Sequence, residues 1–171
     1  MPKTFEEARK DADNLYKSLS KVADDIVKKH TSEIDKTVNH IQENIEKLSN
    51  SDLQTNIMKL SCMAYQLGDL AEHADLKRDC ANALAKENNA KEFNLAAGTV
   101  DTKKNVALLN SSQEQAVNML YNTVSDLFKT KLSSTYRVVD SLKNVLISRN
   151  AEAKLQNANV NAQSVEQEEQ F

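Results

Sequence analysis

The chain contains very little glycine and proline. Among its 171 residues, glycine occurs only at Gly68 and Gly98, and proline only at Pro2. A β-sandwich or a Rossmann fold depends on many tight turns, which these two residue types supply. Their scarcity excludes those folds and favours long, uninterrupted helices. We therefore predict an all-α protein.

Aromatic residues and long apolar runs are also scarce. Tryptophan is absent, and the apolar residues are mostly Leu, Val, Ile and Ala, which suit narrow seams between helices. No stretch approaches the ~20 apolar residues of a membrane span, and the first residues, MPKTFEEARK, are polar. We expect no membrane partner and a cytoplasmic location, which is the host cytoplasm if a phage encodes the chain.

The sequence also lacks recognisable groupings for catalysis or metal binding. His30, His40 and His73 are its only histidines, and none follows a glutamate at the spacing of a di-iron helix motif. Asp69 lies one turn before His73, but two ligands do not make a metal site. There is no glycine-rich phosphate loop. The sequence predicts neither an enzyme nor a cofactor, and places these side chains on solvated helix faces.

The two cysteines are too far apart to form a disulfide within one helix. Cys62 and Cys80 are separated by five helical turns, about 27 Å along the axis, whereas a disulfide requires Cα atoms within about 7 Å. Free cysteines usually behave as small hydrophobic residues. We expect both to be buried.

Apolar periodicity places helices along most of the chain. Residues 1–50 hold two runs, separated by a slip of register near Thr31 and Ser32, so they form either one helix or two. The first run alternates spacings of three and four for three heptads, as in a coiled-coil seam. It comprises Phe5, Ala8, Ala12, Leu15, Leu19, Val22 and Ile26, and the second comprises Ile34, Val38, Ile41, Ile45 and Leu48.

Residues 51–150 are predicted to form an antiparallel helical hairpin with coiled-coil seams. Ser51 and Gln54 have the spacing of a capping box at its start, Gly98 is expected as the residue that ends its first helix, and Asp101 or Thr102 is expected to cap the next. The first helix has an apolar stripe at Leu53, Ile57, Leu60, Ala64, Leu67 and Ala71. The second has one at Val106, Leu109, Ala116, Leu120, Val124, Leu127, Leu132, Val138, Leu142 and Val145.

Residues 151–171 are predicted to be a polar, acidic, disordered tail, with helix near its start. The tail ends in EQEEQF, so that an apolar side chain follows several carboxylates. This ending is similar to the partner-binding tip of bacterial single-stranded-DNA-binding proteins, in which the apolar residue enters a pocket. The candidate partner-binding residues are Glu166, Glu168, Glu169 and Phe171, and a solubilising tail is the alternative.

Positive charge is concentrated in the middle of the chain. Residues 77–149 carry 11 basic and 7 acidic side chains, net +4, although the whole chain is at −3. A hairpin would bring these cations together, where they suit a nucleic-acid backbone; an ordinary solvated face is the alternative. The candidates are Lys77, Arg78, Lys86, Lys91, Lys103, Lys104, Lys129, Lys131, Arg137 and Lys143, with Tyr121, Phe128 and Tyr136 as base-stacking platforms or core residues.

The segment from about 53 to 152 resembles the UvsY-type recombination mediators of tailed phages. The resemblance is carried by VNMLYNTVSDLFKTKLSSTYRVVDSLKNVLISRNAE, with Asp126, Leu132, Arg149 and Glu152 among its matching positions. Within AKEF, Lys91 stands where the family has a DNA-contacting lysine, but Glu92 and Phe93 stand where its arginine is expected. The resemblance implies a homo-oligomer that binds single-stranded DNA and helps to load a recombinase onto strands covered by the single-strand-binding protein.

Three functions follow from these observations. The first is an oligomeric recombination mediator that binds single-stranded DNA nonspecifically. The second is a coiled-coil assembly protein, such as a scaffold, chaperone or virion component, which the heptads of the N-terminal segment favour. The third is a small inhibitor that binds a host protein.

Overall fold

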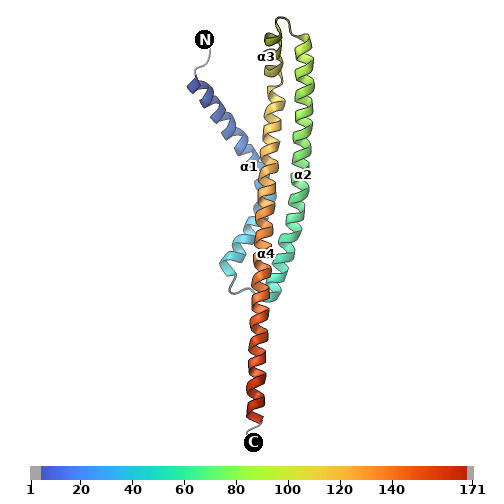
Figure 1. Cartoon of the computed structure of the whole chain (residues 1–171). Coiled ribbons are helices and arrows are strands. Elements are labelled where there is room, and N and C mark those ends of the chain that lie inside the picture. The colour runs from blue at the N-terminus through green and yellow to red at the C-terminus, as the bar shows by residue number, and fades with distance from the viewer. Residues whose placement is uncertain (1–4, 169–171) are drawn as a thin grey trace. The chain divides into compact units, whose positions relative to one another are not determined.

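The computed structural model describes residues 5–168, except for the side chains of residue 8 and residues 159–168. Over the described residues the chain forms helices and no strand, so the all-α prediction is confirmed (Figure 1). The helices are α1 (Phe5–Asn44), α2 (Asn50–Leu95), α3 (Val100–Asn110) and α4 (Ser112–Glu168). None of the described helices combines the length and apolarity that crossing a membrane requires.

The contacts divide the chain into two compact units. Unit 1 consists of Met1–Glu33 and Tyr65–Leu132, and unit 2 consists of Ile34–Ala64 and Ser133–Phe171. The helices α1, α2 and α4 each contribute a segment to both units. Unit 1 contains the whole of α3, the loop before it and most of the predicted DNA-binding residues.

Helix α1 is continuous across the point where the register slips. Thr31 and Ser32 lie inside it, so the two apolar runs share one helix, except for Ile45 and Leu48, which lie beyond its end at Asn44. Thr31 is only 3% exposed, and a threonine inside a helix can satisfy its hydroxyl on the preceding turn, without beginning a new helix. In unit 1 the buried positions of α1 are Ala23, Val27 and Thr31. In unit 2 they include Ile34 and Ile41.

The start of α2 is capped two residues earlier than predicted. The hydroxyl of Ser49 accepts a hydrogen bond from the backbone N–H of Asp52 at 3.1 Å, and the Asp52 carboxylate accepts one from the backbone N–H of Ser49 at 3.0 Å. This is the capping box of the helix, so the assignment to Ser51 and Gln54 was wrong. Asp52 fits the third helical position because its carboxylate also lies near the positive end of the helix dipole.

The apolar stripe predicted for α2 is confirmed, whereas the burial of the cysteines is not. Leu53, Leu60 and Ala64 are at most 1% exposed in unit 2, as is Leu67 in unit 1. Both cysteines are free and exposed. Cys62 lies two positions beyond Leu60, about 200° around the helix and therefore on its outer face. Cys80 precedes the buried Ala81 by one position, and this rotates it out of the seam.

The turn between α2 and α3 differs from its prediction at both ends. Helix α2 ends at Leu95, so Gly98 is not the residue that directly follows it. Gly98 lies within the turn at a φ of 112°, a conformation that favours glycine. The N-cap of α3 is Thr99, whose side chain accepts a hydrogen bond from the backbone N–H of Thr102. Asp101 and Thr102, the predicted caps, are the second and third residues of the helix.

The last predicted helix is divided at Ser111 into α3 and α4. Ser111 is fully buried, and its backbone, at φ −95° and ψ 10°, departs from helical geometry. Its hydroxyl accepts a hydrogen bond from Gln115 Nε2 at 3.0 Å. The break changes the helical phase: Ala107 is fully buried, whereas Leu109, which was predicted in the stripe, is 72% exposed.

Helix α4 contributes core residues to both units. In unit 1, Val124 and Phe128 are at most 2% exposed, and in unit 2 Val139 and Leu142 are at most 3% exposed. Its backbone extends to Glu168, and the side chains of residues 151–158 are all exposed. Disorder of the polar tail stays a prediction. The side chains of the proposed tip, Glu166, Glu168, Glu169 and Phe171, lie outside the described residues.

Candidate nucleic-acid interface

The predicted hairpin is present in unit 1, where α2 packs antiparallel to α3 and α4 (Figure 1). Close to the turn, Asn110 Nδ2 donates to Glu92 Oε2 at 2.5 Å, and Asn88 Nδ2 donates to Glu114 Oε1 at 2.7 Å. Farther from the turn, Asn118 Nδ2 donates to the carbonyl oxygen of Arg78 at 3.1 Å. As the residue numbers of the partners in α3 and α4 rise, those of the partners in α2 fall, which is the order expected of antiparallel helices.

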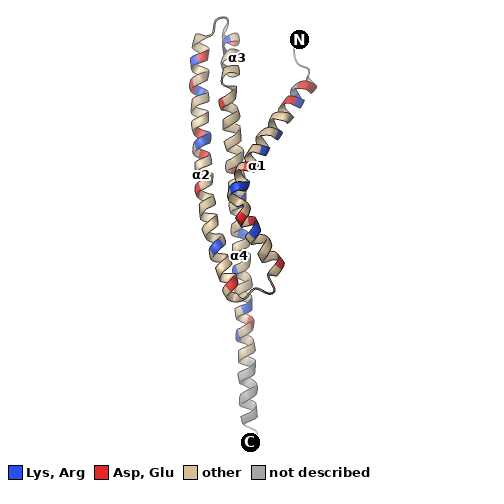
Figure 2. Ribbon diagram, turned by 180° about the vertical axis from the view of Figure 1, so that it is seen from behind, with Lys and Arg blue, Asp and Glu red and all other residues tan. Residues whose placement is uncertain are grey.

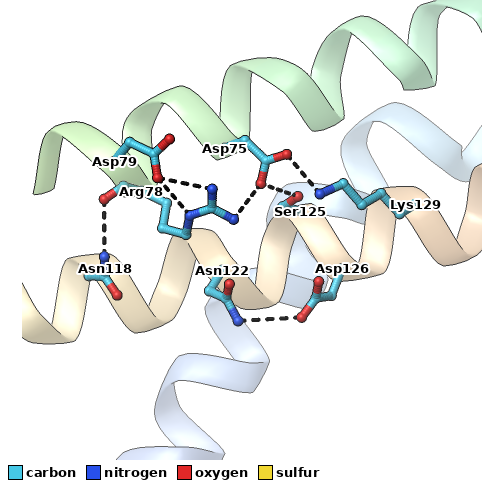
Figure 3. A network of polar contacts seen from close by, with 8 residues as sticks. All are labelled: Asp75, Arg78, Asp79, Asn118, Asn122, Ser125, Asp126 and Lys129. Atoms are coloured by element: carbon cyan, nitrogen blue, oxygen red, sulfur yellow. Dashed lines mark hydrogen bonds and ion pairs between the residues drawn. The ribbon is translucent and has the colours of Figure 1, made fainter. Parts of the chain in front are cut away.

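A polar network joins the two sides of the hairpin at Asp75 (Figure 3). The Asp75 carboxylate accepts a hydrogen bond from the Ser125 hydroxyl at 2.8 Å and one from Lys129 Nζ at 2.7 Å. It also accepts one from Arg78 at 2.7 Å, and the same guanidinium binds Asp79 at 2.9–3.0 Å. The Asp75 side chain is 27% exposed, so the network lies at the edge of the helix–helix seam.

The network compensates the positive charge of two predicted DNA-binding residues, Arg78 and Lys129. The hydrogen bonds from Lys129 and Ser125 hold the pKa of Asp75 below its ordinary value of 3.8, so this carboxylate is ionised at neutral pH. The hydrogen bond to Asp79 raises the pKa of Arg78. Arg78 and Lys129 therefore stay charged, but adjacent carboxylates compensate their charge, which makes both poor ligands for phosphate.

Other predicted cations are also paired within the chain. Lys91 contacts Glu87 at 2.5 Å, and this contact lowers the pKa of Glu87. In unit 2, Lys143 contacts Asp140 at 3.2 Å. Lys131 also has an interaction within the chain. The exposed ion pairs of Lys91 and Lys143 are individually weak, but each places a negative charge beside a residue that was proposed to bind DNA.

The remaining cations of the predicted set have no ion pair with a described carboxylate. In unit 1, Lys77 Nζ lies 5.1 Å from the centre of the Tyr121 ring, and Lys103 Nζ lies 5.9 Å from that of Phe93. Lys86 and Lys104 are exposed. Lys77 and Lys86 lie on α2, and Lys103 and Lys104 lie in the first half of α3. Arg137 belongs to unit 2, where it lines a hollow of about 410 Å³.

The aromatic residues mostly serve the interior of the hairpin. Phe128 is 2% exposed and meets the His30 ring edge to face at 6.0 Å, so it is a core residue and not a stacking platform. Tyr121 is half-buried beneath Lys77. Tyr136, in unit 2, is 47% exposed.

The charges of the hairpin do not form a stripe of one sign. From Lys86 to Glu114 the chain carries four basic and four acidic side chains, and the two signs are interspersed along α2 (Figure 2). The field over this end of the hairpin is therefore weak. A single chain would hold a phosphate backbone by a few local contacts and not by a broad positive surface.

The acidic partners of the cations were not identified from the sequence. Arg78 and Lys129 were selected for their charge, whereas the role of Asp75 depends on a residue 54 positions away. A local signal was present, because Asp75 and Arg78 have the i, i+3 spacing at which opposite charges meet on a helix. No local pattern indicates the pairing of Asp75 with Ser125 and Lys129, which requires the register between α2 and α4.

Two further hollows in unit 1 contain histidine. One of about 90 Å³ lies between α1, α2 and α4, with His30, His73, Lys77 and Tyr121 among its lining residues. The other includes Asp69, Glu72 and His73 on the outer face of α2. Over the described part of the chain, no three His, Cys, Asp or Glu side chains are grouped so that they could hold a metal ion.

Comparison with known proteins gives no relative. No family model matches the chain, and neither a curated protein nor a solved structure matches it.

Proposed function

We propose that this protein is an oligomeric, nonspecific single-stranded-DNA-binding protein of the recombination-mediator kind, which assists the loading of a recombinase. The observation that carries the proposal is that four of the predicted DNA-binding lysines in unit 1 have no ion pair with a described carboxylate: Lys77, Lys86, Lys103 and Lys104. The proposed function is binding, without catalysis.

These four lysines have the properties that a nonspecific phosphate site needs. They lie on the hairpin of unit 1, and they can exchange counterions for phosphate without breaking an ion pair with a described carboxylate. Lys77 and Lys103 each place the ammonium group over an aromatic ring, a contact that positions the cation without adding a negative charge beside it. Because four contacts bind weakly, the proposal requires several chains to act together on one strand.

The proposal is tested by fluorescence anisotropy with labelled oligo-dT at ~50 and ~200 mM salt. We expect saturable binding that weakens steeply with salt. The Lys103→Ala/Lys104→Ala variant should weaken binding and reduce the salt slope by roughly 1.4, because two phosphate contacts to a single strand are removed. The control, Lys17→Ala/Lys21→Ala on α1, makes the same change in net charge and should leave the slope nearly unchanged. Absence of binding at micromolar protein in low salt would refute the proposal.

A coiled-coil assembly protein is the second candidate, and the exposed apolar residues of α1 favour it. Phe5 is 82% exposed, Leu15 47% and Val22 46%. Helix residues of this size in a heptad pattern commonly pack against another helix. An assembly protein without DNA affinity would self-associate in the same buffers in which the anisotropy measurement shows no binding.

A further inference from the structure

Unit 2 contains an apolar hollow of about 410 Å³. Its lining comes from the end of α1, the turn after that helix, and α4. Ile41 and Leu142, each 3% exposed, lie deepest in it, and three half-buried residues complete the apolar lining: Ile45, Val138 and Val145. Pockets that hold ligands have volumes of about 300–1,000 Å³, so the hollow has room for a large apolar side chain.

The α4 side of the hollow is positively charged. Arg137 is exposed, lines the hollow and forms no ion pair with a carboxylate of the described residues. At the other end, the Arg149 guanidinium donates to the carbonyl oxygen of Ile45 at 2.7 Å. Residues 133–149 carry three basic side chains and one acidic, net +2. Glu43 and Glu46 are close in sequence to the lining residues of α1 and its turn, but neither lines the hollow.

The sequence contains a segment whose chemistry complements this hollow. Residues 166–171, EQEEQF, combine three glutamates with a phenylalanine and have no basic side chain. In short-peptide recognition, an apolar anchor enters a pocket while acidic side chains meet cations at its edge. The other phenylalanine that adjoins two carboxylates, Phe5, is followed closely by Arg9 and Lys10, which would oppose the positive edge.

The length of α4 keeps this segment away from the hollow of its own chain. The backbone of α4 is helical to Glu168, which is 23 residues beyond Val145 and therefore about 35 Å from it along the axis. The three residues after Glu168 span at most about 11 Å when fully extended, so they are too short to return. The side chains of residues 151–158 are exposed. A hollow on another copy of the chain is the one that the segment can reach.

We propose that residues 166–171 of one copy of this chain dock in the hollow of unit 2 of a second copy. The Phe171 ring contacts Ile41 and Leu142, and the glutamates lie beside Arg137. The segment and the hollow are different surfaces, so the contact is heterologous and can join more than two chains. The inference does not depend on DNA binding, and its tests contain no DNA. One aromatic anchor binds weakly, and several linked copies strengthen the contact.

Fluorescence anisotropy with a peptide of residues 160–171 tests the contact. The peptide is labelled at its N-terminus and amidated at its C-terminus, so that neither end adds a charge. The protein is the full chain with Phe171→Ala, so that its own segment does not compete. We expect a dissociation constant of about 10–500 μM. A Phe171→Ala peptide should bind about tenfold more weakly or worse, because the anchor is lost. Absence of binding up to about 1 mM protein refutes the proposal.

Variants of the hollow test where the peptide binds. Arg137→Ala should weaken binding roughly two- to fivefold at low salt, whereas Lys143→Ala removes the same charge outside the hollow and should leave binding unchanged. Ser141→Trp fills the hollow from its exposed edge and should abolish binding. Its control is Ser148→Trp, at an exposed serine of α4 that does not line the hollow. Circular dichroism checks the fold of each variant. Equal affinity of the two tryptophan variants refutes the proposal, because the peptide then binds elsewhere.

Disulfide trapping tests whether the contact joins two chains. In a Cys62→Ser/Cys80→Ser background, the full chain with Ser141→Cys and Gln170→Cys should form disulfides between these positions of different chains. The control replaces Ser141→Cys by Ser148→Cys and should cross-link much less. Non-reducing electrophoresis gives the number of chains joined, and mass spectrometry of a digest identifies the linked residues. A disulfide between the two positions of a single chain, or cross-linking no stronger than in the control, contradicts docking on a second copy.

Discussion

Phe128 is the aromatic residue that holds α1 against the hairpin of unit 1. It is 2% exposed, its ring meets His30 at 6.0 Å, and it lines the small hollow between α1, α2 and α4 together with Ile26 and Leu70. Truncating a buried phenylalanine to alanine costs about 3–5 kcal/mol, from the lost transfer free energy and the cavity that remains. The existing hollow of about 90 Å³ would enlarge, and the helices around it can close the space only in part. We therefore expect Phe128→Ala to lower the free energy of unfolding by roughly 3–4 kcal/mol.

Urea denaturation followed by circular dichroism measures this loss. The midpoint should fall while the m-value stays unchanged. Phe128→Leu, which retains much of the volume, is the matched control and should cost less than about 2 kcal/mol. His30→Ala should cost about 0.5–1.5 kcal/mol if it removes only the edge-to-face contact. A cost below about 1 kcal/mol for Phe128→Ala would refute the packing of α1 on this ring, because an unpacked ring loses little on truncation.

The remaining predictions concern single polar or glycine positions. Asp75→Asn should destabilise the chain at neutral pH. The difference should begin to shrink as pH falls below 3.8, the ordinary pKa at which this carboxylate takes up a proton in the unfolded chain, and should disappear below the lowered pKa of the folded chain; urea midpoints across pH measure this. Gly68→Ala should stabilise by about 0.5–1 kcal/mol, because nothing lies within 4 Å of the added Cβ. Gly98→Ala should instead cost at least ~1 kcal/mol at its positive φ, and thermal melting of both variants compares the signs. Arg149→Ala should lower the free energy of unfolding, measured by chemical denaturation, by about 2 kcal/mol, because the Arg149 guanidinium donates to the carbonyl oxygens of Ile45 and Leu48. An unchanged free energy would mean that water satisfies these carbonyl oxygens in place of the guanidinium.

Local sequence signals specified the buried faces of the helices better than they specified where the helices begin and end. The apolar stripe of α2 was predictable because a 3.5–3.6-residue repeat is visible in any window of the sequence. The choice between Ser49 and Ser51 as its cap was not, because serines at both positions have a suitable partner three residues later. The break at Ser111 also left no clear mark, since a serine is compatible with the middle of a helix.

The candidate site was predictable only as a set of charged residues. The sequence placed cations along both sides of the hairpin, but their availability depends on which carboxylates face them. Lys129 and Lys104 are both lysines of the basic middle of the chain, yet only Lys129 forms an ion pair with Asp75. The distinction arises from the register of α4 against α2, which no local pattern encodes.

The sequence by itself determined that this protein is helical, because the scarcity of glycine and proline leaves few places to turn and the apolar repeat has the period of a helix. It also determined the antiparallel hairpin, through a small-residue turn between two long apolar stripes. The tertiary structure alone decided which cations are compensated, which cysteines face solvent and which half of the α1 stripe is left uncovered. Those properties depend on contacts between residues far apart in the chain, and the packing of the helices sets them.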